Sequence, residues 1–222
     1  MQEDSGRCKA HDGATVSLTD HAQRITRTGM RRSAVQPLVE PARGSVELRP
    51  WRPADAASLH AMLSHDEVLQ REVGRGDASS VVGCAEVITR FLAASLPSLQ
   101  HFAISVAGRA VGSVAVSHME HRHDTGWVHY WLAVEARGHG LATRAVASAA
   151  RWAFAERDLY RLELGHRVSN SASCRVAARA GFVMEGIERQ KLRDDRERFD
   201  VETHARLVTD PSPRLRLLPL RW

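Results

Sequence analysis

The stretch VEARGHGLA at residues 134–142 decides the fold, because an apolar strand runs there into a glycine-bearing turn that opens a helix. Glycine lets the backbone come close to a ligand. The first N–H groups of a helix have no partner within the helix. Together with the helix dipole they form a site suited to an anion such as a pyrophosphate. An ordinary strand-to-helix turn is the alternative interpretation of the same residues.

Two other phosphate-binding motifs do not match this turn. A P-loop ends in Gly-Lys followed by Ser or Thr, and no lysine is present in residues 134–142. The dinucleotide fingerprint needs three spaced glycines within a parallel βαβ unit, whereas this turn follows strands that we expect to be antiparallel. The stretch therefore favours neither of these nucleotide-binding folds.

Apolar alternation and helical spacing predict the elements on either side of the turn. The predicted strands cover residues 45–49, 101–107, 110–117, 127–134, 160–166, 182–187 and 200–208. The predicted helices start at 53–55 with Asp55 as N-cap, and cover 80–96, 140–157 and 171–180, the last ended by Gly181. A polar loop is expected at 118–125. The centre of the chain is thus an antiparallel meander that leads into the turn.

Composition divides the 222 residues into a folded part and two ends. Residues 1–44 lack aromatic residues and any sustained apolar period, which is typical of a disordered or loosely packed extension. A second methionine, Met30, makes residues 1–29 a candidate start-site artefact. We expect the domain to cover residues 45–209 and a C-terminal tail to cover 210–222.

The net charge of +5 is carried mainly by the two ends, since residues 45–209 hold 21 basic and 20 acidic residues. Nucleic-acid modules concentrate basic charge on one surface, so we expect no nucleic-acid partner. No stretch approaches the ~18 consecutive apolar residues of a membrane span, and no secretory signal precedes the domain. The three widely spaced cysteines indicate a reducing compartment. We therefore expect a cytoplasmic protein without a membrane partner.

Two blocks of the sequence resemble the GNAT superfamily of N-acetyltransferases. RGHGLA at 137–142 is similar to the family's Arg/Gln-x-x-Gly-x-Gly/Ala pyrophosphate loop. NSAS at 170–173 with RAGF at 179–182 is similar to its Asn-x-x-Ser and Lys/Arg-x-Gly-Phe segment. YWL at 130–132 and EGI at 185–187 look like the branch of ribosomal-protein-alanine N-acetyltransferases. The resemblance covers about residues 45–209.

The resemblance implies an α/β (α+β) fold with a mixed, mostly antiparallel sheet of six to seven strands and helices on both faces. The strands before and after the pyrophosphate helix would be parallel and splayed, with acetyl-CoA entering between them. Backbone groups at 132–134 would bind the pantetheine arm of CoA, and Asn170 would hydrogen-bond the pantetheine amide. Arg175 or Arg179 would bind the 3′-phosphate of CoA. The implied cofactor-binding residues are Leu132, Ala133, Val134, Arg137, Gly138, His139, Gly140, Leu141, Ala142, Thr143, Asn170 and Arg175.

The implied reaction transfers an acetyl group from acetyl-CoA to a primary amine, either a protein N-terminal α-amine or a small-molecule amine. The amine must lose its proton before it attacks, and His129 is the candidate base because histidine titrates near neutral pH. A strand histidine facing solvent is the alternative. Many family members place a tyrosine where this chain has Ala177. The ribosomal-protein-alanine branch shares this departure, and the resemblance to it implies Ser173 as the proton donor or orienting group. A backbone N–H near Leu132 would stabilise the oxyanion.

Other interpretations stay open beside this one. A catalytically degenerate GNAT module would bind CoA as a sensor or scaffold. His118, His121 and His123 suggest a metal site, but no cysteine or second helix-borne pair completes it, so we expect a solvated loop and no metal. The sequence names neither the acceptor nor the oligomeric state, which we take to be a monomer or homodimer.

Overall fold

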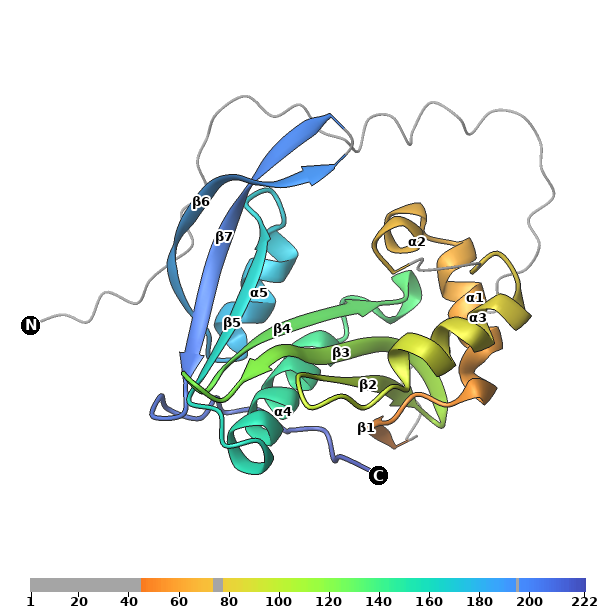
Figure 1. The fold of residues 1–222 in the computed structure, drawn as a ribbon, viewed down its shortest axis with the longest axis horizontal. Coiled ribbons are helices and arrows are strands. Elements are labelled where there is room, and N and C mark those ends of the chain that lie inside the picture. The colour runs from red at the N-terminus through yellow and green to blue at the C-terminus, as the bar shows by residue number, and fades with distance from the viewer. Residues whose placement is uncertain (1–44, 74–77, 195) are drawn as a thin grey trace, which may run out of the picture. The chain divides into compact units, whose positions relative to one another are not determined.

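A seven-stranded sheet forms the framework of the computed structural model, which describes residues 45–73, 78–194 and 196–222. The expectation for residues 1–44 lies outside the described residues. The strands are β1 (Val46–Arg49), β2 (Leu99–Val106), β3 (Arg109–Glu120), β4 (Thr125–Leu132), β5 (Arg161–Arg167), β6 (Val183–Asp194) and β7 (Glu197–Leu207). They lie in the order β1-β2-β3-β4-β5-β7-β6, and only β4 and β5 pair in parallel within the described part (Figure 1). The predicted mixed, mostly antiparallel sheet is confirmed.

Helices cover both faces of this sheet. They are α1 (Ala56–Ser64), α2 (Glu67–Val73), α3 (Val81–Val87), α4 (Leu141–Glu156) and α5 (Ser171–Arg179). Two short 3₁₀ helices, η1 (Pro53–Asp55) and η3 (Val134–Ala136), and a π-helical segment, η2 (Ile88–Leu92), accompany them. On one face, Phe102 of β2 packs edge-on against Trp152 of α4, with ring centroids 5.1 Å apart. On the other, Trp51 donates a 3.2 Å hydrogen bond to Ser113 of β3, just before η1 and α1. None of the described helices is long and apolar enough to span a bilayer.

The two helices that frame the site form for local reasons. Helix α4 is rich in alanine, the best helix former, and its buried stripe includes Leu141, Ala145, Ala149 and Trp152. Helix α5 starts at Asn170, whose side chain accepts a hydrogen bond from the amide of Ser173. It is followed by Gly181 in the left-handed conformation (φ +88°), as the sequence predicts.

Strands β4 and β5 separate after a short parallel contact. They pair at Thr125–Arg161, Gly126–Leu162 and Trp127–Glu163, and β4 then continues to Leu132 paired with β3 but not with β5. Over its whole length β5 instead pairs with β7. The predicted splayed pair is therefore confirmed, and it leaves an opening between the end of β4 and α5.

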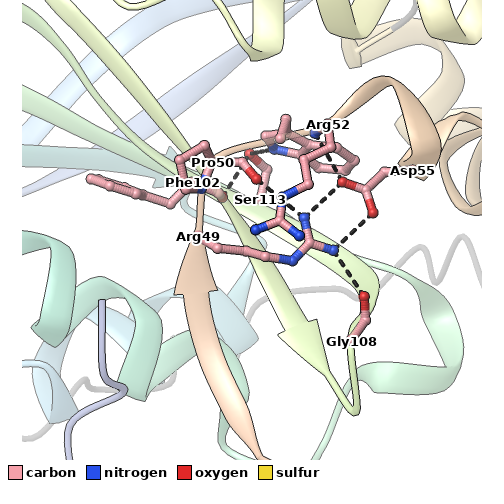
Figure 2. A network of polar contacts seen from close by, with 8 residues as sticks. Arg49, Pro50, Arg52, Asp55, Phe102, Gly108 and Ser113 are labelled. Carbon is pink, nitrogen blue, oxygen red and sulfur yellow. Dashed lines mark hydrogen bonds and ion pairs between the residues drawn. The ribbon is translucent and has the colours of Figure 1, made fainter. Parts of the chain in front are cut away.

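A buried ion pair ties β1 to η1 and to the β2–β3 turn (Figure 2). Arg49 donates two hydrogen bonds to the Asp55 carboxylate, at 2.7 and 2.8 Å, and a third to the carbonyl oxygen of Gly108 at 2.9 Å. The side chains are only 4% and 8% exposed. Asp55 holds the N-cap position of α1, as predicted, but its side chain makes no capping hydrogen bond to that helix. Its carboxylate accepts instead from Arg49 and from the amide of Arg52 at 3.0 Å.

Several element boundaries also differ from the sequence-based prediction. The polar loop expected at 118–125 shrinks, because β3 continues to Glu120 and β4 begins at Thr125. The strand expected to reach Val134 ends at Leu132, and Val134 opens η3. Strands β6 and β7 form a hairpin longer than predicted, and α2 was not predicted. Cross-strand pairing extends these strands, and a local pattern does not report that pairing.

Residues near the C-terminus pack on the first strand. The amide of Leu48 donates to the carbonyl oxygen of Pro219 at 2.9 Å. The amide of Arg221 donates to the carbonyl oxygen of Leu48 at 2.8 Å. Leu218 is buried in the core. Trp222 lies with its ring centroid 5.7 Å from that of Phe102. The segment 218–222 is thus part of the packed structure.

Candidate active site

A cavity of about 560 Å³ opens beside the end of β4, beyond its last pair with β5. Its walls are the end of β4, the glycine turn, the first turn of α4, α5 and part of the 66–69 segment. The predicted site residues that line it are Leu132, Arg137, Gly138, Gly140, Leu141, Ala142, Thr143, Asn170, Ser173 and Arg175. The predicted residues that do not line it are Ala133, Val134, His139 and His129. The structure therefore brings most of the predicted site together.

The glycine turn has a backbone conformation that favours glycine. Gly138 has φ +81° and Gly140 has φ +70°, in the left-handed region that strains most other residues. A Cβ atom built on either glycine meets no atom within 4 Å. The chain therefore turns sharply at the cavity and leaves open space in front of its backbone.

The N-terminus of α4 is an exposed positive end. Gly140 is its N-cap and offers no side chain to the first turn, which holds no acidic residue. The first hydrogen bond of the helix runs from the amide of Arg144 to the carbonyl oxygen of Gly140, at 3.1 Å. The amides that precede Arg144 in the helix therefore have no partner within it. Leu141, Ala142 and Thr143 line the cavity. Such a helix end attracts anionic groups, phosphates included.

Arg137 folds back onto its own strand. Its Nε and Nη2 atoms donate to the carbonyl oxygen of Leu132, at 3.1 and 3.0 Å. Its guanidinium also pairs with Asp66, which caps α2 by accepting from the amides of Val68 and Leu69. Partial burial acts to raise the Asp66 pKa, but the hydrogen bonds from Leu69 and Arg137 outweigh it and hold that pKa below its ordinary value. One arginine thus links the turn, β4 and α2.

The backbone edge predicted to bind pantetheine is partly engaged. The Leu132 carbonyl accepts from Arg137, and the Ala133 amide donates to Val111 at 2.9 Å. Val134 is half exposed and belongs to η3 rather than to a strand. The expectation of a continuous strand edge from Leu132 to Val134 is therefore wrong, because the chain bends into η3 after Ala133.

The start of α5 carries three polar side chains at the cavity. Asn170 uses its Oδ1 atom to cap the helix, at 3.0 Å from the Ser173 amide, while its Nδ2 atom is a separate donor. Arg175 donates to Ser171 at 3.3 Å. The Tyr130 hydroxyl donates to the Ser173 Oγ atom at 3.0 Å. Burial raises the Tyr130 pKa despite that hydrogen bond, so the phenol stays protonated at neutral pH.

His129 lies on the other face of β4 from Tyr130, because successive strand residues point to opposite faces. It is exposed, its Nδ1 atom lies 3.4 Å from the Ser117 Oγ atom, and its ring centroid lies 5.7 Å from that of His101. The structure therefore does not bring the two predicted catalytic residues, Ser173 and His129, together.

Sequence reasoning missed two residues that shape the cavity. Tyr130 appeared only within the family-like YWL triplet, and its contact with Ser173 joins residues 43 positions apart. Asp66 carried a signal, since an aspartate before a short apolar run is typical of an N-cap. Its pairing with Arg137, 71 positions away, had no local signal.

Comparisons with known proteins agree with this geometry. The chain is 34% identical over 96 residues to the probable N-acetyltransferase YjcK of Bacillus subtilis (strain 168), covering 42% of this chain and 53% of that protein. It is 27% identical over 107 residues to the ribosomal-protein-serine acetyltransferase of Escherichia coli (strain K12), covering 48% and 60%. The alignments thus span little more than half the length of these curated relatives.

A solved structure shows the same fold. RimJ of Mycobacterium smegmatis, in complex with CoA-disulfide, superposes with a TM-score of 0.62 at 23% identity, covering 74% of this chain and 86% of that one. The family model of the acetyltransferase (GNAT) domain matches residues 45–183, which is more than half of the sequence. The chain therefore belongs to the GNAT acetyltransferase family.

Proposed function

We propose that this protein transfers an acetyl group from acetyl-CoA to a primary amine. One observation carries the proposal: the uncapped N-terminus of α4 and the Tyr130–Ser173 pair line the same cavity. The helix end and the amides of the glycine turn suit the pyrophosphate of the substrate. Asn170 and Arg175 line the same cavity, and we assign them to its pantetheine and 3′-phosphate. Ser173 and Tyr130 are the hydroxyl groups available where the thiol leaves.

The chemistry of the step assigns a separate task to each side of the thioester. The amine attacks the acetyl carbonyl carbon only after it loses a proton. The C–S bond then breaks, and the departing sulfur takes up a proton. A protonated Tyr130 that donates to Ser173 can hold the serine hydroxyl in position to give its proton to the sulfur. Ser173 can then take a proton from Tyr130 in its place.

Two acceptor classes remain within this proposal: the α-amine of a protein N-terminus and the amine of a small molecule. The name of the Escherichia coli relative supports a protein acceptor. A thiol-release assay with acetyl-CoA, N-terminal peptides and small amines tests both classes. Release that depends on one class of amine identifies the acceptor. Tight binding of CoA without release by any amine supports the alternative of a non-catalytic CoA-binding module.

Replacing Ser173 by alanine should slow turnover more than it weakens acetyl-CoA binding. An interaction made mainly in the transition state lowers kcat without raising KM. We expect kcat to fall about ten- to a hundredfold, at or below the lower range for a positioned acid. Steady-state kinetics with acetyl-CoA as the varied substrate measures both constants.

Tyr130→Phe and Ser169→Ala make this test specific. If Tyr130 acts through Ser173, the double variant Tyr130→Phe with Ser173→Ala should be no slower than Ser173→Ala alone. The effects of two residues in contact are not additive. Ser169 is exposed, lies just before α5 and does not line the cavity, so its alanine variant should match the wild type. A Ser173→Ala enzyme with unchanged kcat would remove the serine from the mechanism.

The sequence-based prediction that His129 is the base has a test of its own, although the His129 side chain does not line the cavity. A histidine base would make the rate depend on pH. The wild-type profile should rise through an ascending limb near neutrality, and His129→Gln should lower the rate and remove that limb. An acceptor of different amine pKa is the control, because a limb that moves with the acceptor belongs to the amine. If the variant keeps both the limb and the rate, His129 is not the base.

A further inference from the structure

Three metal-ligand atoms converge outside the cavity, on one face of the β5–β7 pair. His166 of β5 is the cross-strand partner of Glu202 in β7, and His204 lies two residues further along β7. Residues two apart in a strand share a face. The His204 Nε2 atom lies 2.8 Å from a Glu202 carboxylate oxygen and 3.1 Å from the His166 Nε2 atom. That oxygen lies 3.5 Å from the His166 Nε2 atom.

The hydrogen bonds of this cluster leave a surplus of lone pairs. The His166 Nδ1 atom lies 3.0 Å from the carbonyl oxygen of Arg167, which can only accept, so Nδ1 carries the proton. The Nε2 atom of a neutral His166 ring is then an acceptor. The His166 Nε2 atom faces the His204 Nε2 atom and a carboxylate oxygen of Glu202. The His204 Nε2 atom can carry one proton, and both His166 Nε2 and the carboxylate oxygen would accept it. A cation at the centre satisfies all three atoms.

The spacing of the three atoms fits a first-row metal ion. Zinc binds histidine nitrogen and carboxylate oxygen at ~2.0–2.2 Å, and tetrahedral geometry then places ligand atoms roughly 3.3 Å apart. The observed separations of 2.8, 3.1 and 3.5 Å bracket that value. The contact from His166 Nδ1 to a backbone carbonyl is also the outer contact that metal-bound histidines make.

The surroundings are those of a buried site. The side chains of His166 and His204 are 4% and 1% exposed, and Glu202 is 14% exposed. The Cys174 Sγ atom belongs to the same group, whose ligand atoms all lie within 4.8 Å of one another. Among the described residues no other group of this kind is present, and His118, His121 and His123 do not form one.

We propose that His166, His204 and Glu202 bind one Zn²⁺ ion, with solvent at the fourth position. The ion would lie outside the acetyl-CoA cavity, because none of its three ligands lines that cavity. It would lie directly under α5, where Cys174 follows Ser173 in the chain. The proposal departs from the sequence-based expectation of no metal, and it does not depend on the proposed acetyl transfer.

Metal binding by the untagged full chain tests this site. After chelation and dialysis, the protein is titrated with ZnCl₂ and, as a spectroscopic probe, with CoCl₂. We expect one zinc per chain by elemental analysis, a visible absorption spectrum of four-coordinate cobalt, and a melting temperature that rises with the zinc concentration. MgCl₂, which prefers oxygen ligands, should produce no such rise.

Variants assign the binding to these residues. Glu202→Gln keeps the shape of a partly exposed side chain, and His166→Asn removes a buried ligand. Each should weaken zinc binding by at least the ~10–100-fold that loss of an outer contact costs. His121→Asn, in the exposed β3–β4 turn, is the matched control and should bind like the wild type. Circular dichroism of the metal-free proteins checks folding.

Two results would overturn the proposal. One is a wild-type chain that takes up no zinc and shows no cobalt spectrum, which would mean that the cluster shares a proton instead. The other is a folded Glu202→Gln variant that binds zinc as tightly as His121→Asn does. Because the wild-type cobalt spectrum is decisive by itself, misfolding of the His166 variant would not remove the test.

Discussion

Replacing Asp55 by alanine should lower the free energy of unfolding by about 3–5 kcal/mol, the cost of leaving one charge of a buried pair without its partner. Arg49 would keep its charge without Asp55, because a guanidinium is not deprotonated in proteins. It would keep the carbonyl of Gly108 as an acceptor but lose both carboxylate contacts. A loss of this size is a large part of the ~5–15 kcal/mol that stabilises a typical domain. Urea denaturation, monitored by tryptophan fluorescence, measures the free energy of unfolding of the wild type and of the variant.

Two further variants show whether burial is the cause. Glu185→Ala removes an ion pair with Arg161 whose side chains are 45% and 28% exposed, and an exposed pair contributes only ~0–1 kcal/mol. The double variant Arg49→Met with Asp55→Leu removes both charges and should recover much of the lost stability, because apolar replacements of a buried pair are often neutral. Equal losses for Asp55→Ala and Glu185→Ala would contradict this explanation.

Replacing Gly140 by aspartate should weaken CoA binding about tenfold to a hundredfold, equivalent to ~1.5–3 kcal/mol for one charged contact. The new carboxylate would stand at the N-terminus of α4 and compete with the pyrophosphate for the same amides. The fold should survive, because a Cβ at this position meets no atom within 4 Å. Aspartate and asparagine also tolerate a positive φ better than most residues. Calorimetric titration with CoA measures the effect.

Matched variants separate charge from shape. Gly140→Asn adds almost the same side chain without the charge, so it should retain more affinity than the aspartate variant. Gly108→Asp introduces the carboxylate at another open glycine, with φ +83°, in the β2–β3 turn away from the cavity, and should leave CoA binding unchanged. A folded Gly140→Asp protein with wild-type affinity would mean that the pyrophosphate binds elsewhere.

The part of the site that sequence could predict is the part that depends on neighbouring residues. Gly138 and Gly140 sit a few residues from the helix that they open, and Asn170 caps the helix that follows it. Turn chemistry and helix termini act over such distances. These elements therefore appeared in the sequence in nearly the form that the structure shows.

The rest depends on contacts between distant segments. Arg49 donates both to Asp55 and to the carbonyl oxygen of Gly108, 59 residues away, and the pairing takes the carboxylate away from its expected cap. Tyr130 meets Ser173, and His166 meets His204, across 43 and 38 residues. The extension of β3 to Glu120 likewise depends on its pairing with Thr125 of β4. Periodicity and composition report none of these pairings.

The contact between the last residues and β1 limits how the protein can assemble. The free edge of a sheet presents unpaired backbone groups that recruit another chain. At β1, both backbone groups of Leu48 are already bonded, to Pro219 and Arg221, so a second molecule cannot extend the sheet there without displacing this segment. Among the described strands, β6 forms the other edge of the sheet, at the opposite end of the strand order.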